Sequence, residues 1–233
     1  MILGTIFCRA YGKGIHDKNI QLLNEKPLLA YTIETALNCR MLDDLIVSTN
    51  SEDVAKVAIQ HRARVPFMLP EQLVTNKTSD WSLLLHIVES YEKQFGKEIS
   101  YIVDMNVNVP LKTAADIDGA VKLALQYPET DVVITGYASE RNPYFNMMEL
   151  TDKGYAEMIK RTDESSVPPQ NIPKVFSLSD AAFVIKKSAL YNYSHWSHGL
   201  CRIYEIPHAR ALNMDEEMDF ELIQGRLNRH QTF

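Results

Sequence analysis

Hydrophobic residues in the first 135 positions follow two alternating patterns. Short apolar runs are typical of buried strands and predict strands at 2–7, 45–48, 65–68, 101–103 and 131–135. Between these runs, apolar residues recur every three or four positions, which predicts helices at 27–39, 52–60, about 79–95 and 114–126. Strands that alternate with helices of this length indicate an α/β fold with a mostly parallel sheet.

The regular alternation stops after Thr135. Four prolines interrupt residues 138–178, which predicts an excursion from the sheet rather than a second domain. A strand is expected again at 183–185, and a helix at 216–227. We therefore expect one domain over residues 1–233, with 138–178 as an arm.

Composition and charge exclude several classes of protein. The chain of 233 residues is 45% hydrophobic and 23% charged, as in ordinary globular proteins and unlike disordered or coiled-coil chains. A net charge of −6 without a basic stripe argues against binding to nucleic acid. No apolar run is long enough to cross a membrane, and the N-terminus lacks a basic signal-peptide region, so we expect a cytoplasmic protein. The three cysteines have neither zinc-site nor disulfide-framework spacing.

The most informative segment follows the first predicted strand and reads Cys8-Arg9-Ala10-Tyr11-Gly12-Lys13-Gly14-Ile15-His16-Asp17-Lys18-Asn19. Its two glycines let backbone N–H groups approach a phosphate, and Arg9, Lys13 and Lys18 supply positive charge. It is not a Walker A loop, because no Ser or Thr follows Lys13, and it lacks the third glycine of a dinucleotide-binding fingerprint. On chemistry alone, a phosphate-binding loop and an ordinary solvated loop fit equally well.

This segment resembles the A-R-x-x-S-K-G-x-x-x-K-N motif of the CMP-sialic acid synthetases, also called acylneuraminate cytidylyltransferases. Residues Arg9, Lys13, Gly14, Lys18 and Asn19 match, and Gly12 replaces the serine. The resemblance continues in the same order along the chain, at 26–33, 46–50, 65–67, 69–73, 76–79, 106–112, 116–117, 141–144, 173–176 and 213–220. It is strongest toward the bacterial branch that acts on legionaminic or pseudaminic acid.

The resemblance implies a Rossmann-like nucleotidyltransferase fold and a homodimer formed through the arm. It implies that a sialic acid-like sugar acid attacks CTP, which gives a CMP-sugar and pyrophosphate, with Mg²⁺ as cofactor. Matched to the family motifs, the catalytic residues would be Arg9, Lys13 and Asp215, and the metal ligands Asp215 and Asn213. The nucleotide would be bound by Arg9, Lys13, Lys18, Asn19 and Ser79, and the sugar by Asn106, Asn142 and Phe183.

The sequence also departs from the family. The segment Asn213-x-Asp215 replaces a pair of aspartates that carry the magnesium, so the first ligand would be a neutral amide oxygen. This substitution could weaken the ion, shift it toward Asp104 or retune the activity. Asp215 could instead cap the helix that begins near Glu216. In the sugar pocket, Pro169 replaces an arginine, and Asp180 is a carboxylate that suits an acidic sugar only if it meets a cation or an amine on the substrate.

Two alternatives stay open at this point. The chain could be a related nucleotidyltransferase for another sugar or nucleotide, or an inactive paralogue that binds nucleotide without turnover. The retained cationic loop favours an enzyme, whereas four substitutions favour the inactive paralogue: Tyr11, Asn50, Pro169 and Asn213. The histidines are given no catalytic role: His86 is expected to pack within a helix, and His195 and His198 to lie in a surface loop.

Overall fold

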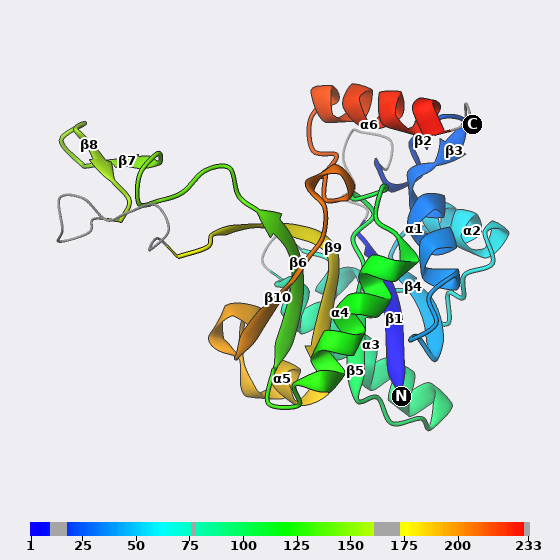
Figure 1. Ribbon diagram of the computed structural model, residues 1–233. Helices are drawn as coiled ribbons and strands as arrows, with labels where there is room; N and C mark the ends of the chain where they lie inside the picture. The colour runs from blue at the N-terminus through cyan, green and yellow to red at the C-terminus, as the bar shows by residue number, and fades with distance from the viewer. Residues whose placement is uncertain (10–17, 76–77, 161–172, 231–233) are drawn as a thin grey trace.

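The computed structural model describes residues 1–9, 18–75, 78–160 and 173–230 (Figure 1). Six strands form one sheet in the order β10-β6-β9-β5-β1-β4. They are β1 Ile2–Cys8, β4 Asp44–Thr49, β5 Tyr101–Asp104, β6 Val132–Ala138, β9 Phe176–Lys186 and β10 Cys201–Glu205. The helices are α1 Leu28–Leu37, α2 Glu52–Gln60, α3 Asp80–Phe95, α4 Ala114–Gln126, α5 Lys187–Asn192 and α6 Glu217–His230. Two small ribbons pair β2 Leu22–Leu23 with β3 Lys26–Pro27 and β7 Met148–Leu150 with β8 Ala156–Met158.

The sheet separates two hydrophobic cores. Buried residues of α1, α2 and α4 pack in one core, and those of α3 and α5 pack in the other. Successive strand residues point to opposite faces, so Val47 enters the first core while Ile46 enters the second. This layering confirms the predicted α/β fold with a mostly parallel sheet.

Local signals set the ends of the helices. Ser51 caps α2 by accepting a hydrogen bond from the Val54 backbone N–H, as its position before Glu52 predicts. Ser79 caps α3 in the same way through the Ser82 N–H. Gly96 ends α3 in the left-handed conformation, with φ at +63°, which costs a glycine little. Arg9, the residue after β1, donates to the Thr78 carbonyl, so the start of α3 lies beside the carboxyl end of β1.

Strand β9 runs antiparallel to both of its neighbours, β5 and β6, in a sheet whose other pairs are parallel. Its pairing with β6 is interrupted: Phe183 is opposite Ile134, and Leu178 is opposite Gly136. The intervening residues of β9 therefore form a bulge. Thr135 closes this bulge, because its hydroxyl donates to the Ser179 carbonyl at 2.6 Å and accepts from the Ala182 N–H at 3.0 Å.

Some of the predicted elements were wrong or incomplete. Residues 65–68 do not form a strand; the only pairing there is an isolated bridge between Arg64 and Ile46 among the described residues, and Pro66 removes a donor. The strand predicted at 183–185 is the last part of the longer β9, and β10, α5 and the β7–β8 ribbon were not predicted. The other predicted helices and strands are present within a few residues of their expected bounds.

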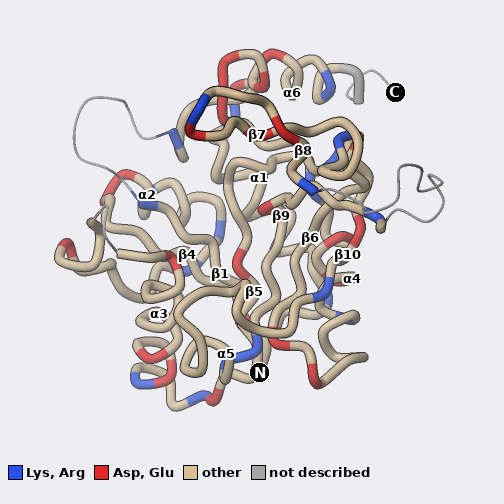
Figure 2. Tube along the Cα trace, turned by 90° about the vertical axis from the view of Figure 1, so that its left-hand side faces the viewer, with Lys and Arg blue, Asp and Glu red and all other residues tan. Residues whose placement is uncertain are grey.

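Residues 139–160 carry the chain away from the sheet. Figure 1 shows the β7–β8 ribbon standing clear of the sheet and its helices. No helix in the described part of the chain is long and apolar enough to cross a membrane. Basic and acidic residues are interspersed along the trace (Figure 2), as expected for a chain with a small net negative charge.

Candidate active site

A cavity of about 380 Å³ lies beside the carboxyl end of β5. The first turns of α3, the end of β5, the β9 bulge and the loop after α5 each supply part of its wall. The lining residues are Ser79, Asp80, Trp81, Leu84, Asp104, Asn106, Asp180, Phe183, Ile185, His195 and Trp196. This is where ligands bind in sheets built from parallel β–α units.

Aromatic contacts hold the outer wall of the cavity. The Trp81 indole N–H donates to the Tyr193 carbonyl at 2.8 Å, which ties the loop after α5 to α3. Phe183 and Trp196 meet edge to face with 6.0 Å between ring centroids. His195 and His198 lie in a surface loop, as predicted, but this loop also brings His195 and Trp196 to the cavity. Phe183, one of the predicted sugar-binding residues, lines the same space.

Arg9 joins the end of β1 to the start of α3. Its guanidinium donates to the Thr78 carbonyl at 3.1 Å and forms an ion pair with Asp80. It also lies over the ring of Phe7. Ser79, which was predicted to contact the nucleotide, follows Thr78 and lines the cavity. The structure therefore brings two of the predicted nucleotide-binding residues together, although Arg9 already has a carboxylate partner.

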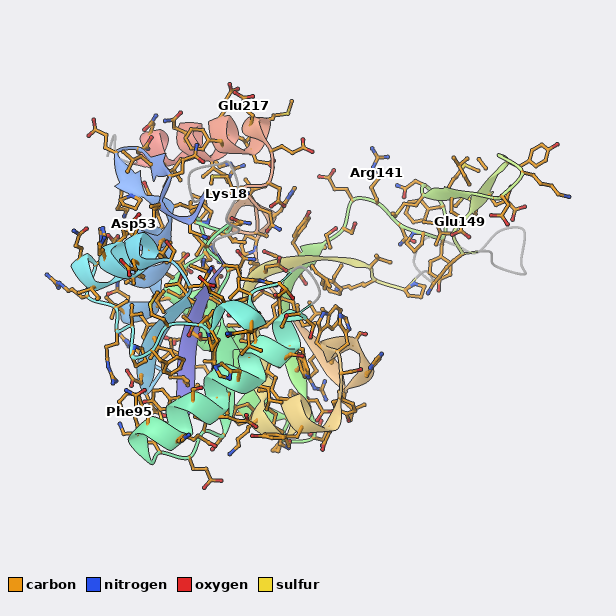
Figure 3. The ribbon with its side chains drawn as sticks, turned by 180° about the vertical axis from the view of Figure 1, so that it is seen from behind. Lys18, Asp53, Phe95, Arg141, Glu149 and Glu217 are labelled. Atoms are coloured by element: carbon orange, nitrogen blue, oxygen red, sulfur yellow. The ribbon has the colours of Figure 1, made fainter. Side chains whose placement is uncertain are left out.

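Lys18 and Asp215 are far apart in the sequence but lie close together in the structure. The Lys18 ammonium lies 3.7 Å from the Oδ1 oxygen of Asp215, which also lies 3.5 Å from the Asn108 amide nitrogen. Asn19 donates from its side-chain amide to the Arg9 carbonyl at 3.5 Å. Figure 3 shows Lys18 on the body of the molecule beneath α6. Lys18, at the end of the predicted phosphate-binding loop, is thus in contact with the predicted metal-binding segment.

Asn213 has an unusual environment. Its side-chain carbonyl oxygen is shielded from solvent and has no hydrogen-bond partner among the described residues. A buried carbonyl without a partner is costly, so such an oxygen is suited to a ligand. Asp215 is well exposed, and its backbone N–H donates to Asp219, so Asp219 rather than Asp215 caps the start of α6. The capping alternative for Asp215 is therefore wrong.

Two ionisable residues lie close together at the cavity: the buried Lys112 and the half-buried Asp104, which is part of the lining. Lys112 is 3% exposed, and its ammonium donates to Thr32 Oγ1 and to the carbonyls of Asn106 and Val109. Burial lowers the pKa of Lys112 to about 7, although Asp104 opposes the shift. Burial, together with the charge of Asp180, raises the pKa of Asp104 to about 7. The network fixes the backbone around Asn106, a predicted sugar contact.

The β9 bulge places Asp180 in the cavity wall. The Asp180 carbonyl accepts from the Asn106 N–H at 3.2 Å, so the bulge is joined to the segment after β5. Ser179, within the same bulge, donates its hydroxyl to the Ala211 carbonyl at 3.1 Å. Burial and the charge of Asp215 raise the pKa of the Asp180 carboxyl. Asp104, Asp180 and Asp215 therefore influence one another electrostatically.

Other predicted residues lie elsewhere. Asn142 does not line the cavity; its side-chain oxygen accepts from the Tyr144 N–H at 3.0 Å and shapes the base of the arm. Lys13 and Pro169 lie outside the described residues. Reasoning from the sequence considered Asp104 only as an alternative metal ligand and placed neither Asp104 nor Trp196 in the wall, although an aspartate at the end of a buried strand is a recognisable signal.

A family model described as cytidylyltransferase matches residues 4–198, which include most of β1, Lys18 and the whole cavity lining. The chain belongs to the cytidylyltransferase family. The predicted resemblance is confirmed, because the matched region covers most of the sheet and the loop after β1.

Relatives of this cytidylyltransferase match almost its entire length. The chain is 26% identical to "Post-translational flagellin modification protein B" of Campylobacter coli over 96% of this chain and 93% of the relative. It is 25% identical, over the same shares, to the "CMP-N,N'-diacetyllegionaminic acid synthase" of Campylobacter jejuni. Its fold is similar to that of a solved CMP:2-keto-3-deoxy-manno-octonic acid synthetase, with a TM-score of 0.70, 12% identity and coverage of 98% of this chain and 99% of that one.

Proposed function

We propose that this cytidylyltransferase activates a nine-carbon sugar acid with CTP. The anomeric hydroxyl oxygen of the sugar bonds to the α-phosphorus, and the bond from that phosphorus to the bridging oxygen of the β-phosphate breaks. The products are a CMP-sugar and pyrophosphate, and the hydroxyl proton is released. The observation that carries the proposal is the meeting of Lys18 and Asp215 beside the cavity, at 3.7 Å, in a chain that matches a CMP-legionaminic acid synthase over 96% of its length.

The nucleotide site would use the residues that surround the end of β1. Transfer of a phosphoryl group depends mainly on positioning and on neutralising charge, so cations at the triphosphate are the chief requirement. Lys18 would bind phosphate oxygens together with Lys13 from the glycine-bearing loop. Asn19 donates to the Arg9 carbonyl, and Arg9 donates to the Thr78 carbonyl just before α3, where Ser79 lines the cavity. Arg9 would exchange its contact with Asp80 for the departing pyrophosphate.

Asp215 and Asn213 would hold Mg²⁺. The donor set fits a hard cation, because a carboxylate and an amide carbonyl are both oxygen ligands and the Asn213 oxygen lacks a partner among the described residues. When bound, the ion would neutralise charge on the phosphates. Lys18, which is paired with Asp215 in this structure, would then be available to the triphosphate.

The sugar would occupy the deeper part of the cavity. Asn106, which follows β5, and Phe183, within β9, both line it. Asn142 is too far along the chain toward the arm to line this cavity, so a role in sugar binding would require contact through a second protomer.

The arm would form a homodimer. Several large apolar side chains of the arm are exposed, namely Phe145, Met148, Leu150, Tyr155 and Ile159. A ribbon of two short strands is barely stable alone in water, and exposed apolar clusters of this kind mark protein contacts. Figure 3 shows Arg141 and Glu149 out along this arm, away from Lys18. We therefore keep residues 138–178 as a dimerisation arm of a single domain.

Pyrophosphate release tests the proposed reaction. The purified protein would be supplied with Mg²⁺, with CTP, UTP, GTP or ATP, and with a panel of sialic, legionaminic, pseudaminic and eight-carbon sugar acids. Release that requires both CTP and one nine-carbon sugar acid is expected. Release with another nucleotide or only with an eight-carbon acid would identify a related transferase, and CTP binding without any release would favour the inactive paralogue.

A further inference from the structure

The cavity wall carries negative charge, which would repel the carboxylate of an acidic sugar. Its lining residues include three carboxylates, Asp80, Asp104 and Asp180, and neither lysine nor arginine is among those that the structure describes there. Asp80 is neutralised by its ion pair with Arg9. The charges of Asp104 and Asp180 are the ones that a ligand in the cavity would meet.

One carboxylate oxygen of Asp104 has no hydrogen-bond donor among the described residues. This Oδ1 atom is also shielded from solvent. The ammonium of Lys112 is the cation that acts on it, but the three acceptors of that ammonium are Thr32, Asn106 and Val109. An ammonium has only three hydrogens, so Lys112 offers Asp104 attraction at a distance and no hydrogen bond.

Asp180 is surrounded by like charge. Its side chain is held in the cavity wall by the bulge that Thr135 closes. Asp180 interacts electrostatically with two other carboxylates, those of Asp104 and Asp215, and both interactions are repulsive when the groups are ionised. A cation brought by a ligand would relieve this repulsion, and the aromatic rings of Trp81, Phe183 and Trp196 in the same wall also attract cations.

We propose that Asp104 and Asp180 bind a positively charged nitrogen on the sugar, so that the preferred substrate carries a free amino group. This inference rests on the proposed function. An ionised carboxylate only accepts hydrogen bonds, and an ammonium supplies three donors and the opposite charge. An N-acetyl group, as named for the diacetyllegionaminic acid of the Campylobacter jejuni relative, would bring a carbonyl oxygen and a methyl group to the same two carboxylates.

A divalent cation is the alternative occupant of this part of the cavity. Asp104 and Asp180 offer it two carboxylates, and no third His, Cys, Asp or Glu side chain is grouped with them among the described residues. The ammonium needs only these two carboxylates, and the Mg²⁺ requirement of Asp180→Asn separates the two occupants.

The test compares two sugar acids that differ only in having a free amine or the corresponding N-acetyl group. Wild-type protein, with CTP and Mg²⁺, should use the amine with a kcat/KM at least about tenfold higher, as expected for a charged hydrogen bond. Asp180→Asn and Asp104→Asn keep the shape and remove the charge, so each should lower that preference about tenfold or more. The control Asp53→Asn removes an exposed carboxylate of α2 and should leave the preference unchanged.

Thermal unfolding would confirm that each variant is folded. If Asp104→Asn does not fold, the result for Asp180→Asn alone decides the test. A wild-type preference for the acetylated sugar, or a preference that Asp180→Asn does not alter, would overturn the inference while leaving the proposed reaction intact. A change only in the Mg²⁺ requirement of Asp180→Asn would also overturn it, by assigning Asp180 to the metal. Failure of both sugars and of the whole nine-carbon panel would overturn the inference together with the proposed function.

Discussion

The ammonium of Lys18 lies 3.7 Å from the carboxylate of Asp215, and this contact joins the segment after β1 to the segment before α6. Both side chains are partly exposed, at 39% and 60%, so the pair adds little to stability. Under the proposed function, the two side chains lie together because they bind the same ligands. Phosphate oxygens would replace Asp215 as the partner of Lys18, and a divalent cation would replace Lys18 as the partner of Asp215.

Replacing Lys18 should impair turnover without unfolding the protein. We expect Lys18→Ala to lower kcat/KM for CTP by about 10- to 100-fold, because it removes one cation from the triphosphate. The melting temperature should change little, since the pair is exposed. Lys56→Ala is the matched control, because it breaks the exposed ion pair with Asp53 on α2. Equal activity of the two variants would remove Lys18 from the site.

Asn213→Asp should make the protein more dependent on Mg²⁺. A carboxylate in place of the partnerless amide oxygen adds a buried negative charge near Asp215, which should lower the melting temperature in the presence of EDTA. Mg²⁺ should then raise the melting temperature more than in the wild type and act at lower concentration in the assay. Asp215→Asn should abolish the thermal response to Mg²⁺. A variant Asn213→Asp that is indifferent to Mg²⁺ would refute the metal site.

Asp104→Asn should stabilise the protein at alkaline pH. Burial raises the pKa of Asp104 in the folded state to about 7, so the folded protein keeps a proton that the unfolded chain loses above its ordinary pKa near 3.8. The contribution of this group to stability therefore falls as the pH rises from about 4 to about 7, and the full penalty is present above pH 7. Lys112 reduces this penalty without cancelling it, because the pKa stays raised.

The melting temperature of Asp104→Asn, relative to wild type, should thus increase between pH 5 and pH 8. A gain on the order of 1 kcal/mol corresponds to about 2–4 °C for a chain of this size. Asp53→Asn, at an exposed site, serves as the control and should show no such trend. A difference that is constant with pH would contradict a raised pKa at Asp104.

The arm should control the oligomeric state. Leu150 and Tyr155 are 76% and 70% exposed on the β7–β8 ribbon. Replacing both with lysine should convert a dimer to a monomer in light-scattering measurements, because the charges cannot be buried in an apolar contact. Met218→Lys is the control, since Met218 is equally exposed but lies in α6. A wild-type protein that is monomeric at micromolar concentration would contradict the dimer.

Much of the fold could be predicted because it depends on local patterns. Apolar spacing located the helices, and Ser51 and Ser79 marked two of their starts. Strand β9 was recognised only in part, because its antiparallel course and its bulge depend on pairing with β5 and β6 and on Thr135. Strand β10 pairs only with β6 at the edge of the sheet, and its residues show no strong buried run.

The candidate site, too, could be predicted only in part. The resemblance to the synthetases predicts Lys18 and Asp215 in one site, and in the structure their charged groups lie 3.7 Å apart. The buried charges of Asp104 and Lys112 could not be predicted, because the burial of an ionisable group depends on what packs around it from other elements. The same holds for Trp196, which reaches the cavity because Trp81 is hydrogen-bonded to Tyr193.

The most direct measurement is the identity of the product formed from CTP. The protein would be incubated with CTP, Mg²⁺ and the nine-carbon sugar acids, and the products examined by mass spectrometry and phosphorus NMR. The account predicts a compound in which CMP is joined to the sugar through a phosphodiester, formed in equal amount with pyrophosphate. Pyrophosphate accompanied by free CMP, or CTP left unchanged with every sugar acid, would contradict it.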